Sequence, residues 1–285
     1  MAKLLYEALG TGILLDLPEA IPTLHLQAHV PGITPVTPGT STTIEVVVKH
    51  VHGAVLVVWQ SGITTIVSGP WTPTLREDLP HLLYAILRQH WLANSKYPVH
   101  SVCIGNILLL GHSGSGKTTL AKRALAEGWP VSSFDKTVAY FEKEQLRVLG
   151  GTSVLSMRAS LAERDSENLA ISDRTISPAI CSYPPNEVRQ LCLIRLDGQP
   201  LRVENLSAES ALHQLVPFFM DTTKSLVTLG AGQAVFEGTT PHATPERLVR
   251  DLRAWLAASP PVQVVTGGRE TVLGHISAQL GKESA

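Results

Sequence analysis

One short segment, Gly111 to Thr119, contains the residue types that bind nucleotide phosphates. Its sequence, Gly-His-Ser-Gly-Ser-Gly-Lys-Thr-Thr, fits the pattern of a glycine, four free positions and Gly-Lys-Thr. In such loops glycines let the backbone wrap around a phosphate, the lysine reaches the β- and γ-phosphates, and the next hydroxyl binds Mg²⁺. Lys117 and Thr118 are predicted to have these two roles. The predicted nucleotide-binding residues are Gly111, Ser113, Gly114, Ser115, Gly116, Lys117, Thr118 and Thr119.

The residues on either side of this segment predict the strand and the helix that a phosphate-binding loop requires. The apolar run Ile107 to Leu110 precedes it, and an amphipathic stretch over 120–126 follows and ends before Gly128. A buried strand, a glycine loop and a helix occur in this order in nucleotide-binding P-loops, where free amides at the helix start point at the anion. The alternative is a glycine- and serine-rich surface loop with an unrelated lysine. We predict that the chain binds a nucleoside triphosphate.

A carboxylate is needed near such a loop because it helps to hold the Mg²⁺ that offsets charge during phosphoryl transfer. Asp135 follows the loop helix, in a segment over 131–140 that predicts a strand, or a strand with a turn at 134–136. This strand can lie beside the loop strand, which would bring Asp135 close to Thr118. The alternative is an aspartate in a surface turn, where this residue type is common.

The composition of the chain limits its location and partners. Its 285 residues carry a formal net charge of −1 without a cluster of Lys and Arg, so polynucleotide binding is disfavoured. Cys103, Cys181 and Cys192 are far apart among apolar neighbours, which favours buried, reduced thiols. No secretory signal pattern occurs, and no stretch approaches the roughly 20 apolar residues of a membrane helix. We expect a cytoplasmic protein that binds neither membranes nor nucleic acid.

Strand and helix patterns divide the chain into a β-rich N-terminal region, residues 1–94, and a nucleotide-binding domain, residues 95–285. The first part predicts an antiparallel meander over 42–67, then a helix over 75–92 with Pro80 in its first turn. Its two histidine pairs have metal-site spacings, but no cysteine or clustered carboxylate accompanies them, which favours solvated or half-buried imidazoles. These pairs are His25 with His29 and His50 with His52.

The second part is expected to mix strands and helices. A strand at 99–104, the turn Gly105-Asn106 and the loop strand predict an antiparallel hairpin that enters the phosphate loop. Later segments predict a strand at 190–196, helices at 207–219 and 245–258, a strand at 260–265 and a short helix at 271–280. The polar segment 159–178 is expected to be a loop or a flap.

The order of these elements resembles the catalytic domain of the HPr kinase/phosphorylase family and its shorter relatives. The resemblance rests on the loop, the helix that ends at Gly128 and the following Val131 to Val138, and it covers about residues 95–280. It implies a phosphoenolpyruvate-carboxykinase-like P-loop fold: an α/β domain with a mixed or antiparallel sheet, here preceded by the small β-rich region. It also implies ATP and Mg²⁺ as cofactors, and transfer of phosphate to a hydroxyl of a protein serine or a small metabolite.

One position departs from the family pattern. HPr kinases have two consecutive aspartates after the loop helix; the first assists removal of the acceptor proton and the second binds the metal. Here Phe134 takes the first position and Asp135 the second, and a phenyl ring accepts no proton. His100, one strand from the loop, is a candidate substitute base, and the alternative is a core histidine. The other candidates are Arg158 and Arg174 as phosphate contacts, and Asp165 and Asp173 as carboxylates of a closing flap.

Three functions are compatible with these residues. The first is an ATP- and Mg²⁺-dependent kinase, with Lys117, Asp135, His100 and Arg158 in catalysis and with Thr118 and Asp135 as metal ligands. In this hypothesis the N-terminal strands shape the acceptor site or form a contact in a homo-oligomer. The second is a nucleotide-binding regulatory or scaffolding protein without phosphate transfer, which the phenylalanine favours. The third is a kinase that modifies a peptide product.

Overall fold

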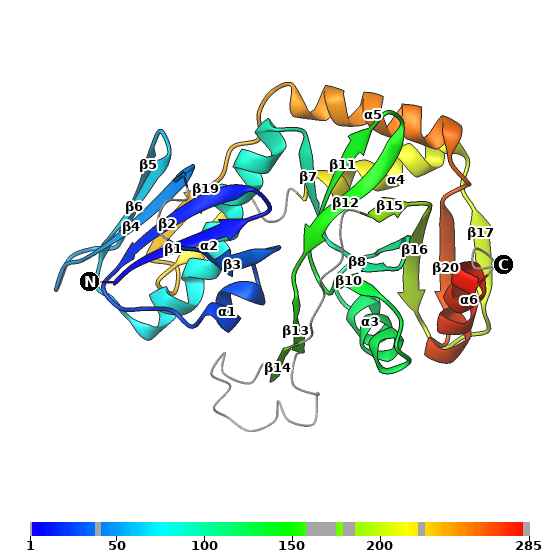
Figure 1. Ribbon diagram of the computed structural model, residues 1–285, viewed down its shortest axis with the longest axis horizontal. Coiled ribbons are helices and arrows are strands. Elements are labelled where there is room, and N and C mark those ends of the chain that lie inside the picture. The colour runs from blue at the N-terminus through cyan, green and yellow to red at the C-terminus, as the bar shows by residue number, and fades with distance from the viewer. Residues whose placement is uncertain (1, 38–40, 158–174, 179–185, 222–225, 282–285) are drawn as a thin grey trace.

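The computed structural model describes residues 2–37, 41–157, 175–178, 186–221 and 226–281. Within these residues, six helices and five sheets make the chain a mixed α/β protein. The N-terminal sheet lies at one end of the molecule and the last helix, α6, at the other (Figure 1). In the described part of the chain, every helix is too short or too polar to cross a membrane.

The N-terminal sheet has six strands in the order β3-β1-β2-β4-β6-β5. They are β1 (Ala2–Ala8), β2 (Thr11–Leu17), β3 (Ile33–Pro35), β4 (Ile44–His50), β5 (Val57–Ser61) and β6 (Thr64–Gly69). The predicted antiparallel meander is wrong in part: β5 and β6 are antiparallel, but β4 is parallel to β6 and to β2. After β4 the chain passes to the edge of the sheet and returns as β6. Residue patterns in the sequence identify a strand but not its neighbour in the sheet, so they do not predict that β4 pairs in parallel.

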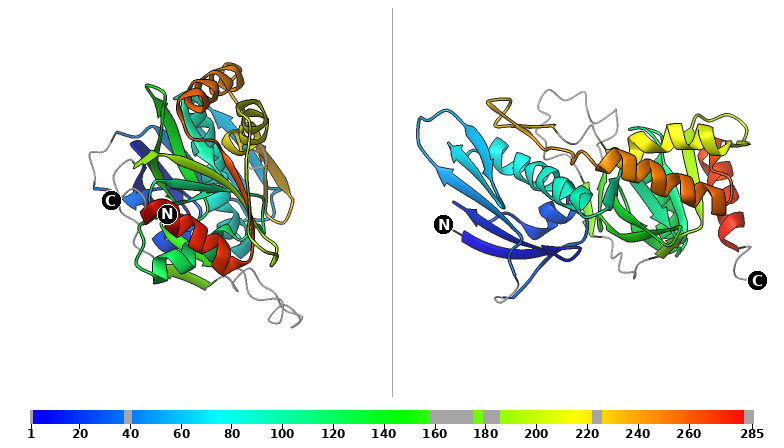
Figure 2. Two further views of the ribbon diagram at one scale, coloured as in Figure 1. Left: turned by 90° about the vertical axis from the view of Figure 1, so that its right-hand side faces the viewer. Right: turned by 90° about the horizontal axis from the view of Figure 1, so that it is seen from above.

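Helix α2 (Pro73–Ala93) packs against this sheet, and the short helix α1 (Thr23–Gln27) lies nearby (Figure 2). The predicted helix over 75–92 is therefore confirmed. It begins earlier than expected, because the Thr72 side chain accepts a hydrogen bond from Leu75 N at 3.1 Å and caps the first turn. Pro80 thus lies in the helix interior and not in its first turn, which corrects the prediction.

The core of the N-terminal sheet also receives a hairpin from the C-terminal half of the chain. This hairpin consists of β18 (Leu226–Leu229) and β19 (Ala234–Glu237). Val227, Leu229 and Phe236 are buried in the same cluster as α2 and the sheet. Residues far apart in sequence therefore stabilise this end of the molecule together.

Beyond the N-terminal sheet, the larger sheets of the molecule are a second six-stranded sheet, called the six-stranded sheet below, and a four-stranded sheet. The first has the order β10-β8-β9-β16-β20-β17, and the second β15-β12-β11-β7. The strands of the six-stranded sheet are β8 (Ser101–Ile104), β9 (Ile107–Leu110), β10 (Val131–Ser133), β16 (Gln190–Leu196), β17 (Arg202–Asn205) and β20 (Gln263–Gly267). Those of the four-stranded sheet are β7 (Lys96–Val99), β11 (Thr137–Glu142), β12 (Gln145–Gly151) and β15 (Asn186–Val188), and β13 (Val154–Met157) pairs separately with β14 (Thr175–Pro178).

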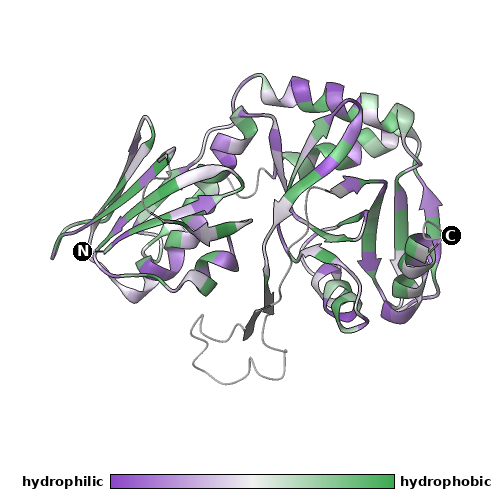
Figure 3. Ribbon diagram, in the orientation of Figure 1, coloured by the Kyte–Doolittle hydropathy of each residue, from purple (hydrophilic) through white to green (hydrophobic). Residues whose placement is uncertain are grey.

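Helices cover both faces of the six-stranded sheet: α3 (Lys117–Ala126) and α6 (Arg269–Gly281) on one, α4 (Ala208–Met220) and α5 (Thr244–Ala258) on the other (Figure 1). Leu108 and Leu110 of β9 pack with α4 and α5, whereas Ile107 and Leu109 pack with α3 and α6. A strand buried on both faces needs a continuous apolar run, as β9 has. The neighbouring β16 is also mostly hydrophobic (Figure 3).

The predicted hairpin before the phosphate loop is confirmed, since β8 and β9 are antiparallel around Gly105-Asn106. The strand at 190–196 and the helices near 207–219 and 245–258 are confirmed as β16, α4 and α5. Ser207 caps α4 by accepting a hydrogen bond from Ser210 N. The last strand and helix lie near the predicted positions, as β20 and α6.

Candidate functional site

The segment Gly111 to Thr119 joins the end of β9 to the first turn of α3, so the predicted order of strand, loop and helix is confirmed. The loop packs directly against β16, where Leu196 N donates to the Ser115 carbonyl at 2.9 Å. Gly116, with φ of +98°, precedes the helix, and a Cβ there would lie 2.3 Å from Leu196 Cδ1. Glycine is therefore required at this position by both backbone conformation and space.

The amides at the start of α3 remain available for an anion. In the described residues, the N–H groups of Gly116, Lys117, Thr118 and Thr119 donate to no carbonyl. Such amides, with the positive end of the helix dipole, favour a bound phosphate. Ser113, Gly114 and Thr119 are exposed, so solvent and ligand can reach this end of the helix.

The side chain of Lys117 is buried and turns back over the loop. Its ammonium donates to the Gly111 carbonyl at 2.5 Å and to the His112 carbonyl at 3.2 Å. Burial lowers the pKa of Lys117 to about 8, an effect that the nearby Asp135 carboxylate partly opposes. A buried ammonium bonded to neutral carbonyls gains electrostatically from a phosphate oxygen, so Lys117 is suited to an anionic ligand.

His100 and Asp135 lie where two neighbouring segments of the chain pass from one sheet to the other. The predicted strand at 99–104 is broken at His100, with β7 in the four-stranded sheet and β8 in the six-stranded sheet. The segment over 131–142 is broken at 134–136 in the same way, between β10 and β11. Because β7 pairs with β11 and β8 with β10, the two breaks face each other.

The Asp135 carboxylate lies between two basic side chains. Its Oδ1 is 3.6 Å from His100 Nδ1, and its Oδ2 is 3.7 Å from Lys136 Nζ. The Asp135 side chain is 41% exposed, which leaves it accessible to a ligand or an ion. The structure places Asp135 beside His100 and close enough to Lys117 to affect its pKa, so it relates three of the four predicted catalytic residues.

Backbone hydrogen bonds fix the turn that carries Asp135. Thr152 Oγ1 accepts from the amides of Asp135 and Lys136 at 3.1 and 3.3 Å, and the Thr152 carbonyl accepts from Phe134 N at 3.2 Å. On the other side, Ser101 N donates to the Asp135 carbonyl at 3.1 Å. Since residues from two other segments, Thr152 and Ser101, hold the turn, the carboxylate is carried on a rigid support.

Phe134 does not face the phosphate loop. Its side chain is 1% exposed and packs in the core with residues of α3, among them Leu120 and Ala124. The position expected to hold the family's proton acceptor is thus a hydrophobic anchor. The structure gives a physical reason for the departure seen in the sequence.

The donor groups near the loop suit magnesium better than a transition metal. In the described residues, no group of three or more His, Cys, Asp or Glu side chains could hold a metal ion, including the two histidine pairs. Mg²⁺ needs fewer protein ligands, because it is usually bound by one or two carboxylates together with phosphates and water. The hydroxyl of Thr118 and the carboxylate of Asp135 are oxygen donors of this kind.

Several predicted residues lie outside the described residues, namely Arg158, Arg174, Asp165, Asp173 and Cys181. The other two cysteines, Cys103 and Cys192, are buried free thiols as predicted. Burial raises their pKa values to about 11 and about 12. These thiols stay protonated near neutral pH and take no part in the site.

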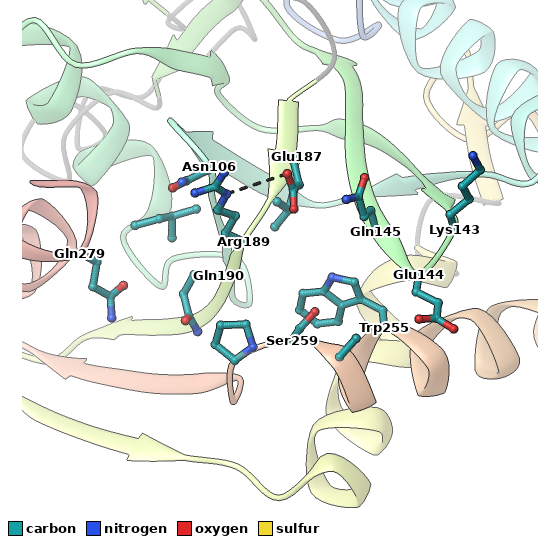
Figure 4. A pocket seen from close by; sticks show the side chains of 14 residues that line it. Asn106, Lys143, Glu144, Gln145, Glu187, Arg189, Gln190, Trp255, Ser259 and Gln279 are labelled. Carbon is teal, nitrogen blue, oxygen red and sulfur yellow. Dashed lines mark ion pairs between the residues drawn. The ribbon is translucent and has the colours of Figure 1, made fainter. Parts of the chain in front are cut away.

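A hollow of about 570 Å³ lies at the opposite ends of β9 and β16 from the phosphate loop. Figure 4 shows its polar lining, which includes Asn106, Gln190 and the ion pair between Arg189 and Glu187. It contains none of the predicted site residues. The hollow is therefore separate from the predicted nucleotide site.

Sequence reasoning missed two residues that support the site, Thr152 and Lys136. Both act through contacts with segments distant in sequence, so their own residue types do not indicate these roles. The pair Gly150-Gly151 was a signal for Thr152, because adjacent glycines in a strand often mark a close approach of two backbones.

Comparison with known proteins finds distant structural similarity to solved structures. No protein-family model matches the chain, and no curated protein sequence matches it. The solved structure of the Hpr(Ser) kinase/phosphatase from Coxiella burnetii is similar over 66% of this chain and 94% of its own, with 12% sequence identity and a TM-score of 0.27. A likeness this distant does not define the reaction.

Proposed function

We propose that the chain is an ATP- and Mg²⁺-dependent kinase with a phosphoenolpyruvate-carboxykinase-like P-loop domain, acting in the cytoplasm on a hydroxyl-bearing acceptor. The observation that carries the proposal is that Asp135 lies close enough to Lys117 to affect its pKa and 3.6 Å from His100 Nδ1, although the three residues come from separate segments. An ammonium, an exposed carboxylate and an imidazole beside free helix amides are the groups that phosphoryl transfer needs.

The loop and Lys117 would bind the nucleotide phosphates. The free amides of α3 would donate to the β- and γ-phosphate oxygens, and the ammonium would exchange its two carbonyl partners for phosphate. Thr118 and Asp135 would hold Mg²⁺, which supplies charge stabilisation to the phosphates when it is bound. Arg158 is proposed as a further contact for the transferred phosphate.

His100 is the proposed proton acceptor. The acceptor hydroxyl oxygen would form a bond to the γ-phosphorus while the bond to the β,γ-bridging oxygen breaks, and ADP would leave with that electron pair. The proton of the hydroxyl would pass to the imidazole, whose Nδ1 faces the Asp135 carboxylate. A carboxylate beside one ring nitrogen orients the ring and stabilises its protonated form.

A second candidate function is nucleotide binding without transfer. The buried side chain of Phe134 favours it, because the family's proton acceptor is absent and the replacement serves the core. The two candidates share the loop and differ only in whether a proton acceptor acts. A regulatory protein of this kind would bind Mg·ATP but would not transfer phosphate to any acceptor.

Incubation with γ-labelled ATP, Mg²⁺ and a panel of hydroxyl metabolites, peptides and cell lysate tests the proposal. The wild type is expected to label an acceptor, and Lys117→Ala is expected to abolish labelling. Lys122→Ala, an exposed lysine on α3, is the matched control and should behave as wild type. ATP binding without labelling of any acceptor would support the second candidate, and labelling that persists in Lys117→Ala would contradict the assigned site.

A further inference from the structure

The turn that presents Asp135 is anchored on both sides by buried side chains. Phe134 enters the core beneath α3, and Lys136, only 3% exposed, points the opposite way, toward the N-terminal part of the chain. The exposed carboxylate lies between these two anchors. Its position therefore depends on two separate packing environments.

The environment of Lys136 comes largely from the first 94 residues. Its ammonium donates to the His29 carbonyl at 3.0 Å and lies 4.7 Å from the centre of the Tyr84 ring on α2, in a cation–π contact. Tyr84 in turn donates its hydroxyl hydrogen bond to Asp221 Oδ2 at 2.7 Å. Since Asp221 ends α4, the ring below the ammonium is fixed from both halves of the chain.

A backbone contact joins the same two regions next to Thr152. Gly32 N donates to the Gly151 carbonyl at 3.0 Å, and a Cβ at Gly150 would lie 2.6 Å from Leu9 Cδ2. The following residue, Thr152, holds the amides of the Asp135 turn. The N-terminal part thus touches the supports of Asp135 twice, through its side-chain anchor and through the strand that holds its backbone.

We propose that Lys136 is a positioning residue: it fixes Asp135 at the phosphate loop and makes the placement of that carboxylate depend on contact with the N-terminal β region. The inference rests on the proposed function, because it assigns Asp135 to Mg²⁺. It gives the β-rich region a role in assembling the metal site from a distance.

A positioning role and a plain charge effect predict changes of opposite sign. If Lys136 were only a cation 3.7 Å from the carboxylate, its removal would strengthen Mg²⁺ binding, because a repulsive neighbour is lost. If it positions the carboxylate, its removal weakens Mg²⁺ binding. Partners that orient metal ligands typically account for at least about tenfold in metal affinity.

The test measures the Kd for ATP of the full chain by calorimetry, once in EDTA and once in Mg²⁺. The Kd in EDTA divided by the Kd in Mg²⁺ is called the magnesium gain. We expect Lys136→Met to have the wild-type Kd for ATP in EDTA and a magnesium gain about tenfold smaller than that of the wild type. Tyr84→Leu, which removes the ring but leaves the turn intact, should lose part of it. Lys122→Met is the matched control and should equal wild type, and thermal melting verifies that each variant is folded.

The outcomes separate the two proposals. An unchanged or larger magnesium gain in folded Lys136→Met and Tyr84→Leu, while Asp135→Asn loses the gain, would overturn the positioning role alone. No magnesium gain in the wild type, with Asp135→Asn unchanged, would overturn the metal site and the positioning role together. Loss of ATP affinity in EDTA in both variants would show a general structural role and would also overturn the inference.

Discussion

The protonation of Lys117 predicts how nucleotide affinity changes with pH. Burial lowers the pKa of this ammonium to about 8, so it is about 90% charged at pH 7 and about 10% charged at pH 9. If only the charged form holds the phosphates, the affinity for ATP in EDTA should fall roughly tenfold between these values. The bound phosphate favours the charged form, so binding between pH 8 and 9 should take up protons.

Calorimetry in buffers of different ionisation enthalpy measures the affinity and the proton uptake together. The buried thiols Cys103 and Cys192 and the buried phenol of Tyr84 have raised pKa values, so they do not titrate in this window. Lys117→Met should bind more weakly and show no dependence between pH 7 and 9, whereas Lys122→Met should follow the wild type. A constant wild-type affinity across this range, without proton uptake, would refute the reasoning about Lys117.

Two further predictions concern the support of the site and the proton acceptor. Gly151→Ala should lower the free energy of unfolding by about 1–3 kcal/mol in denaturant melts, because its Cβ would lie 2.1 Å from Ser133 Cβ. Gly274→Ala on α6, whose Cβ would meet nothing within 4 Å, should be neutral or stabilising, and equal behaviour of the two would contradict the steric argument. His100→Gln should bind ATP as wild type does but transfer phosphate about 100-fold more slowly in the labelling assay. Transfer at the wild-type rate would exclude His100 as the proton acceptor.

The strand, loop and helix around Lys117 could be predicted because each is encoded locally. Four apolar residues form β9, glycines form the turn, and Gly128, with φ of +79°, follows the end of α3. The turn at 134–136 was also visible, as an interruption of a strand pattern. These signals depend only on residues a few positions apart.

The pairing of His100 with Asp135 depends on sheet topology, which the sequence does not encode locally. In a continuous strand over 99–104 alternate side chains would point to opposite faces of one sheet. The chain is instead broken at His100 between β7 and β8, and there the imidazole lies 3.6 Å from the Asp135 carboxylate. For the same reason, no local pattern in the sequence indicates that Lys136 is buried. Its burial follows from the approach of His29 and Tyr84, more than 50 residues away in the chain.

A crystal structure of the chain with Mg²⁺ and a non-hydrolysable ATP analogue tests the central claim most directly. We expect the β- and γ-phosphates on the first amides of α3 and on Lys117, with Mg²⁺ bound by Thr118 and Asp135 and with His100 on the acceptor side of the γ-phosphate. A nucleotide bound elsewhere, such as in the hollow beside Asn106 and Gln190, or a metal that does not touch Asp135, would contradict it.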